Sequence, residues 1–296
     1  MRKLEPVKDD ALTFIGEVIS SSRKKGKDSD ESNNITEIFR KTCSTLVSDN
    51  EQVIKQYDYD FKMNSLENLK DIGRLNDEEK DDFLSLYSYQ KKRIKNLRNE
   101  VLTQNGYINE NCPICECDSV STMDHYLPKE KYPIFVVHPR NLIPCCGACN
   151  GHKSDIVFQE GKRKFWNCYL DQPITKRYLY CTITKTNDLL VGKFSTDYSL
   201  LFDHEAVMIE NTMSDKGQNV LEQYNKKVGN GINELVKNIV RLRQSSYSYD
   251  DSLEILKKQL PKTILNDWKD VLYDALLNSQ EFVRFAEIES EKILEK

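Results

Sequence analysis

Apolar residues recur at helical spacing through the first hundred residues of the chain. One face of a predicted helix is formed by Ala11, Phe14, Ile15, Val18 and Ile19. Such spacing of three and four residues is typical of a helix with one buried side. A second stripe begins at Ile35 and runs to Leu46. The polar stretch between them, residues 20–34, predicts a flexible loop.

A capping signal marks the start of a further helix in this region. Asn76 stands three residues before Glu79, the spacing at which two side chains can bond each other's backbone amides. The apolar positions that follow predict one long helix from there to Val101. Asn105-Gly106 then predicts a tight turn that ends the helical region.

The pattern changes after residue 106. Residues 107–158 contain closely spaced Cys, Asp, His and Asn, and two alternating segments follow, 178–183 and 189–194. Because the segments are joined by a short stretch that contains Lys185-Thr-Asn-Asp188, they predict a β-hairpin. Helical spacing returns near Ser214, and the glycines in 229–231 predict a break in it. Pro261 separates two later helices, and Ser279 begins a last one.

These elements predict an α+β fold with three parts. Residues 1–106 form an N-terminal helical region, residues 107–200 a central module with the following hairpin, and residues 201–296 a C-terminal helical region. At 39% hydrophobic residues the chain can bury a core. We expect a cytoplasmic protein with no membrane association, because no long apolar run and no signal-like N-terminus is present.

Cysteines gather in the central module, where six of the nine fall between Cys112 and Cys149. Cys112 and Cys115 form one CxxC pair, and Cys146 and Cys149 form another. Four thiolates at this spacing predict a structural Zn²⁺ site that leaves no ligand position open for catalysis. Cys117 and Cys145 adjoin these pairs, so either could contribute in place of a neighbour. We favour Cys146 because it stands three residues before Cys149.

The residues between and after the cysteine pairs suit phosphodiester hydrolysis. That reaction needs a base for the attacking water and a cation for the developing charge. His125 suits the base because its ordinary pKa lies near neutrality. Asp124 and Asn150 offer oxygen atoms to a hard cation. Lys153 shares a helical face with Asn150 and would reach a phosphate oxygen. His152 is an alternative ligand or supporting group.

At these residues the chain resembles the HNH endonucleases, the zinc-bearing branch of the ββα-metal nucleases. The resemblance covers residues 107–158 and rests on Asp124-His125, Asn141, both CxxC pairs, and Asn150 with Lys153. It implies one catalytic Mg²⁺ or Mn²⁺ on Asp124 and Asn150, and products with 5′-phosphate and 3′-hydroxyl ends. It assigns to Asn141 the positioning of the loop that carries the base. Many relatives have His where this chain has Asn150.

A looser resemblance, around residues 126–133 and 141–144, is to bacterial HNH proteins found in defence loci. Some of those proteins, such as Septu-type nucleases, act with an ATPase partner. The resemblance therefore implies DNA as substrate, with RNA as the alternative, and an ATPase subunit as partner. The chain carries a net charge of −4, yet nine cations and five anions lie between Asp124 and Arg177. This local excess favours phosphate binding on one surface.

Two alternatives remain at the level of sequence. A zinc-ribbon module that binds nucleic acid or protein without catalysis would need the cysteines but not Asp124, His125 or Asn150. The segment 162–166 pairs three cations with Phe165 and Trp166. These aromatic side chains either stack on bases, while the cations follow a nucleic-acid backbone, or pack inside the protein.

Overall fold

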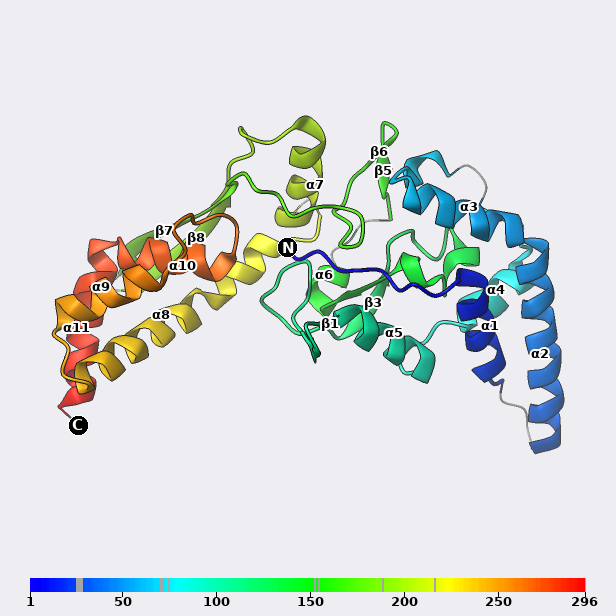
Figure 1. Cartoon of the computed structure of the whole chain (residues 1–296), viewed down its shortest axis with the longest axis horizontal. Helices are drawn as coiled ribbons and strands as arrows, with labels where there is room; N and C mark the ends of the chain where they lie inside the picture. The colour runs from blue at the N-terminus through cyan, green and yellow to red at the C-terminus, as the bar shows by residue number, and fades with distance from the viewer. Residues whose placement is uncertain are drawn as a thin grey trace. The chain divides into compact units, whose positions relative to one another are not determined.

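The chain, taken here from a computed structural model, divides into two compact units, Arg2–Gln172 and Pro173–Lys296 (Figure 1). The structure describes residues 1–24, 29–69, 72–73, 75–151, 153, 155–187, 189–215 and 217–295. Within the described residues, no helix combines the length and the apolar character that a membrane span requires.

Five helices form much of the first unit: α1 (Ala11–Ser21), α2 (Ser29–Asp49), α3 (Glu51–Lys62), α4 (Asp77–Ser85) and α5 (Lys92–Leu102). The side chain of Asp10 caps α1 by accepting a hydrogen bond from the amide of Thr13 at 3.0 Å. The predicted face of α1 is buried, which confirms that prediction. The predicted loop is wrong from Ser29 onward, because α2 begins there with Asp30 and Glu31 in its first turn. Acidic side chains stabilise a helix N-terminus.

The Asn76–Glu79 cap is confirmed. The Asn76 side chain accepts from the Glu79 amide at 2.9 Å, and the Glu79 carboxylate accepts from the Asn76 amide at 2.8 Å. The single long helix predicted after it is wrong, since residues 86–91 separate α4 from α5. In this break the hydroxyl of Tyr87 donates to the carbonyl of Met123 at 2.5 Å. A distant partner in the tertiary structure therefore interrupts the helix.

The short elements of the first unit surround the cysteine-rich segment. They are β1 (Thr103–Gln104), β2 (Tyr107–Ile108), β3 (Thr122–His125), β4 (Leu142–Cys145), α6 (Gly147–Gly151), β5 (Phe158–Gln159), β6 (Lys162–Arg163), and the 3₁₀ turns η1 (Leu66–Asn68), η2 (Pro133–Phe135) and η3 (Pro139–Asn141). Asn105 and Gly106 have φ angles of 50° and 86° and form the predicted turn between β1 and β2. A two-residue turn with both φ angles positive suits the twist of a hairpin.

Strands β3 and β4 pair antiparallel, and α6 follows directly and contacts β3. His125 lies opposite Leu142, and Asp124 lies opposite Ile143. The segment between the CxxC pairs thus contains two short paired strands, and a helix follows them. The α+β fold class is confirmed, because helices and small two-stranded sheets share the chain. The HNH module itself stays a prediction.

The second unit contains the predicted hairpin and five helices. They are β7 (Leu179–Thr186), β8 (Leu189–Thr196), α7 (Asp203–Met213), α8 (Val220–Gln244), α9 (Tyr249–Gln259), α10 (Trp268–Leu277) and α11 (Gln280–Leu294). The sequence grouped the hairpin with residues 107–200, whereas it packs against α8 and α10 within this unit. The three-part division of the chain stays a prediction.

The predicted break at residues 229–231 is wrong, because α8 runs continuously through both glycines. A Cβ atom on Gly231 would lie 2.5 Å from a methyl carbon of Leu272 on α10, whereas one on Gly229 would meet nothing within 4 Å. Gly231 therefore allows two helices to approach closely and does not end a helix.

Candidate active site and metal centre

Four buried cysteines from two separate turns converge in the first unit. The sulfur atoms of Cys112, Cys115, Cys146 and Cys149 all lie within 4.8 Å of one another. The Sγ atoms of Cys115 and Cys146 are 3.8 Å apart. Tetrahedral Zn²⁺ with bonds of about 2.3 Å requires sulfur–sulfur distances of about 3.8 Å. The predicted convergence of these four thiols is confirmed, and the cluster can hold a metal ion such as zinc.

The protonation of the cluster also suits a cation. Hydrogen bonds from Cys112, Cys115 and Cys149 lower the pKa of Cys146, whereas burial raises the pKa of Cys112. The protons of the neighbouring thiols therefore favour the deprotonated form of Cys146. A metal ion would displace these protons, because thiolates are the ligand form of cysteine.

The two alternative thiols lie outside the four-sulfur cluster. Cys145 is fully buried on β4, and burial raises its pKa. Cys117 is half-buried, and its side chain hydrogen-bonds that of Cys115. The preference for Cys146 over Cys145 therefore agrees with the geometry of the cluster.

Strand β3 ends in the two residues that sequence analysis assigned to catalysis. Adjacent residues on a strand point to opposite faces, so the side chains of Asp124 and His125 diverge. The Nε2 atom of His125 donates to the carbonyl oxygen of Val136 at 2.8 Å. Its ring also lies edge-on to Tyr87, with ring centroids 4.4 Å apart. These two contacts fix both the orientation and the tautomer of the imidazole.

His125 is neutral at physiological pH. Burial lowers its pKa to about 4, and the positive charges of Lys129 and Lys153 act in the same direction. Because Nε2 carries the proton donated to Val136, Nδ1 is the nitrogen that can accept another. A neutral imidazole with one assigned donor is the form that a general base requires.

Asp124 is held in an ion pair with Lys153. The Lys153 ammonium lies 2.7 Å from Asp124 Oδ2 and also donates to the main-chain oxygen of His125. Only 6% of the Lys153 side chain is exposed. Burial raises the pKa of Asp124, and Lys153 opposes this effect. Two oxygens thus converge on one positive charge, which is the environment that a hard cation also prefers.

A cavity of about 250 Å³ brings the predicted catalytic residues together. Asp124, His125, Asn150 and Lys153 all line it. Asn150 is exposed near the end of α6 and not at the start of a helix, as its place after the CxxC pair had suggested. His152, the alternative ligand, lies outside the described residues.

Asn141 lies outside this cavity lining and is fully buried beneath the loop that follows His125. Its Oδ1 atom accepts from the amide of Leu127 at 2.7 Å. Its Nδ2 atom donates to the carbonyls of Leu127 and Phe135, each at 3.2 Å. The side chain therefore fastens both ends of the loop that leads to Val136, the hydrogen-bond partner of His125.

The aromatic residues of segment 162–166 are internal, whereas Lys162 is exposed. Trp166 is only 3% exposed, and Phe165 only 1%. Arg163 is bound by Asp171, with Nη2 and Oδ1 2.6 Å apart. Base stacking by these aromatic residues is therefore the wrong alternative, and packing is the right one.

Sequence analysis missed several residues of the cavity. Tyr87, Lys129, Glu130 and Asp155 also line it. Glu130, Lys129 and Asp155 belong to the same motif region, so their nearness in sequence was an available signal. Tyr87 lies 38 residues from His125 in an apparently helical stripe, and no sequence pattern marked it.

Comparison with known proteins gives partial matches. The chain is 24% identical over 212 residues to protein ea31 of Escherichia phage lambda, covering 65% of this chain and 69% of ea31. It is 35% identical over 96 residues to the Septu protein PtuB of Bacillus thuringiensis, covering 30% of this chain. That second match spans about one third of PtuB, 35% of its length. No family model and no solved structure matches the chain.

Proposed function

We propose that this chain is a metal-dependent endonuclease of the HNH type that hydrolyses phosphodiester bonds. The observation that carries the proposal is the arrangement of the cavity. A neutral, oriented His125 and a half-buried Asp124 line the same space as Asn150 and Lys153. The reaction requires a base and an anionic metal ligand side by side, and these four residues supply both.

His125 would take the proton of the attacking water on Nδ1. Its bond to Val136 keeps Nε2 protonated, so the ring is presented in one tautomer. Asn141 would serve the base indirectly, since its amide holds the loop between Leu127 and Phe135.

Asp124 and Asn150 would hold one Mg²⁺ or Mn²⁺. When bound, this ion would stabilise the negative charge that develops on the phosphate. Lys153 would leave Asp124 and bind a phosphate oxygen of the substrate, because the ion and the ammonium compete for the same carboxylate. The four-cysteine cluster would hold Zn²⁺ for structure alone, since four thiolates fill a tetrahedral shell.

We assign DNA as the substrate, with RNA as the second choice, and an ATPase subunit as the partner. The likeness to a Septu protein supports a role in anti-phage defence. The excess of cations between Asp124 and Arg177 supports nucleic-acid binding.

A non-catalytic zinc module is the second candidate, and one observation favours it. Lys153 neutralises Asp124, the residue that the nuclease needs as a metal ligand. Such a module would bind nucleic acid or protein without cutting.

Plasmid cleavage with Mn²⁺ distinguishes the two functions. The native chain, alone or with its ATPase partner, should nick or linearise DNA, and His125→Ala should not. Equal cleavage by both proteins would contradict the assignment of His125 as the general base. Binding of DNA by the native chain together with the partner, but without cleavage, would favour the zinc module.

A further inference from the structure

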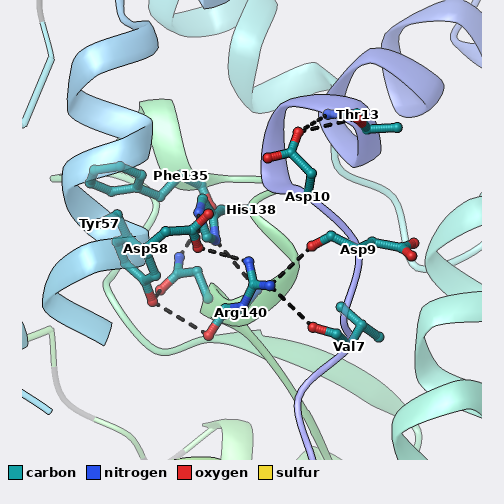
Figure 2. Close-up of polar contacts among 10 residues, drawn as sticks. Val7, Asp9, Asp10, Thr13, Tyr57, Asp58, Phe135, His138 and Arg140 are labelled. Carbon is teal, nitrogen blue, oxygen red and sulfur yellow. Dashed lines mark hydrogen bonds and ion pairs between the residues drawn. The ribbon is translucent and has the colours of Figure 1, made fainter. Parts of the chain in front are cut away.

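A largely buried polar cluster in the first unit contains Tyr57, Asp58, His138 and Arg140 (Figure 2). Arg140, on η3, is its centre and is 9% exposed. Its Nη1 atom lies 2.8 Å from Asp58 Oδ1 on α3. Its Nη2 atom donates to the carbonyls of Val7 and Asp9, at 3.2 Å and 3.0 Å. One guanidinium therefore joins η3 to α3 and to the segment before α1.

His138 holds the same turn from its other end. Its Nδ1 atom accepts from the Arg140 amide at 3.3 Å, while its Nε2 atom faces Asp58 Oδ1 at 3.4 Å. The imidazole is fully buried, and its ring centroid is 4.2 Å from that of Tyr57. Burial lowers the pKa of His138, so the neutral ring keeps Nδ1 as an acceptor.

Tyr57 connects this cluster to Asn141 directly. Its hydroxyl lies 3.4 Å from the Arg140 carbonyl and 3.4 Å from Asn141 Oδ1. Asn141 in turn hydrogen-bonds the backbone of Leu127 and Phe135. Val136, which follows Phe135, accepts a hydrogen bond from His125 Nε2 through its carbonyl oxygen. These hydrogen bonds, together with the peptide bond between Phe135 and Val136, thus connect α3 to the imidazole.

We propose that Tyr57, Asp58 and Arg140 are positioning residues for His125, acting through Asn141. This inference rests on the proposed function, because it takes His125 as the base. None of these residues lines the cavity at His125. Their effect would therefore fall on the orientation of the base and not on contact with the substrate. Small displacements of a catalytic group can lower a rate strongly while leaving binding intact.

Two mild substitutions test the proposal, Tyr57→Phe and Asp58→Asn. Tyr57→Phe removes the hydroxyl and its two contacts, and Asp58→Asn removes the negative charge that faces Arg140 and His138. Both keep the side-chain size, and Asn141 Oδ1 keeps its bond from Leu127. Ile19→Val on α1 is the stability control, because it removes one buried methylene and no hydrogen bond. Circular dichroism and zinc content would verify that all three variants fold.

The first measurement is independent of cleavage. In protein labelled with ¹⁵N-histidine, the Nε2–H signal of His125 is assigned by its loss in His125→Gln. We expect its exchange with water to rise about tenfold in Tyr57→Phe and Asp58→Asn, and to stay unchanged in Ile19→Val. Unchanged exchange in both test variants, or an equal rise in the control, would overturn the proposal.

The second measurement separates kcat from KM in plasmid cleavage. Both variants should lower kcat about fivefold with KM within about twofold, and the double variant should lower it little further, because both residues act by one route. Full additivity or a change confined to KM would contradict this route. If no protein cleaves DNA, the proposed function fails, and the exchange experiment still decides whether the cluster orients His125.

Discussion

The ammonium of Lys153 lies 2.7 Å from Asp124 Oδ2, within the cavity that His125 also lines. Sequence analysis assigned Asp124 to a metal ion and Lys153 to a phosphate oxygen. The structure instead pairs the two side chains with each other. A divalent cation at Asp124 would have to displace this ammonium or share the carboxylate with it.

We expect Lys153→Met to bind Mn²⁺ about tenfold more tightly than the native chain, because a competing positive charge is removed from the half-buried carboxylate of Asp124. Titration calorimetry without nucleic acid would measure this affinity. Lys129→Met is the matched control, since Lys129 lines the same cavity and no ion pair with Asp124 is seen for it in the described part of the chain. An equal gain in both variants would indicate a general effect of charge.

His125→Ala should lower cleavage by at least about 100-fold, as expected for loss of a general base. In the native chain the acidic limb of kcat/KM should lie well below pH 6.5, because burial lowers the pKa of His125 to about 4. A base is active when neutral, so activity should persist as the pH falls from 7 toward 5. An acidic limb centred at pH 6.5 would contradict the buried, oriented imidazole.

The lowered pKa of His125 also makes the folded state less stable in acid. The unfolded chain binds a proton on this histidine near its ordinary pKa of 6.5, while the folded chain does so only near 4. The contribution of His125 to stability is therefore full above pH 6.5 and is lost progressively between these values. Urea unfolding should show less acid sensitivity in His125→Gln. Equal acid sensitivity in both proteins would contradict this assignment.

The cysteine cluster predicts different outcomes for two adjacent thiols. Cys146→Ser should lose the bound zinc and several kcal/mol of unfolding free energy, because metal binding is linked to folding. Cys145→Ser should keep about one zinc per chain, since Cys145 lies outside the four-sulfur cluster. Elemental analysis and thermal unfolding would measure both effects. Retention of zinc by Cys146→Ser would overturn the ligand assignment.

Two glycines of α8 form a second matched pair. Gly231→Ala should destabilise the fold by about 1–3 kcal/mol, because its Cβ would lie 2.5 Å from a methyl carbon of Leu272. Gly229→Ala should stabilise it by about 0.5–1 kcal/mol, because the new methyl meets nothing within 4 Å and alanine favours the helix. Urea unfolding would compare them. Destabilisation by both would indicate a break in α8 after all.

Local patterns predicted much of the fold correctly. The buried face of α1, the Asn76–Glu79 cap and the Asn105–Gly106 turn are each decided within a few residues. The errors arose where a distant contact overrides local preference. Tyr87 binds Met123 in the break between α4 and α5, and Gly231 packs on Leu272 inside a continuous helix.

For the site, sequence by itself predicted which residues would carry the proposed chemistry, because the CxxC spacing and the Asp124-His125 pair lie close together in the chain. It predicted the four-sulfur cluster and the residues that line one cavity. Only the tertiary structure decided three relationships. The carbonyl of Val136 fixes the tautomer of His125, Lys153 forms an ion pair with Asp124, and Arg140 connects η3 to α3. These relationships depend on burial and on contacts between residues far apart in the chain, and spacing along the sequence records neither.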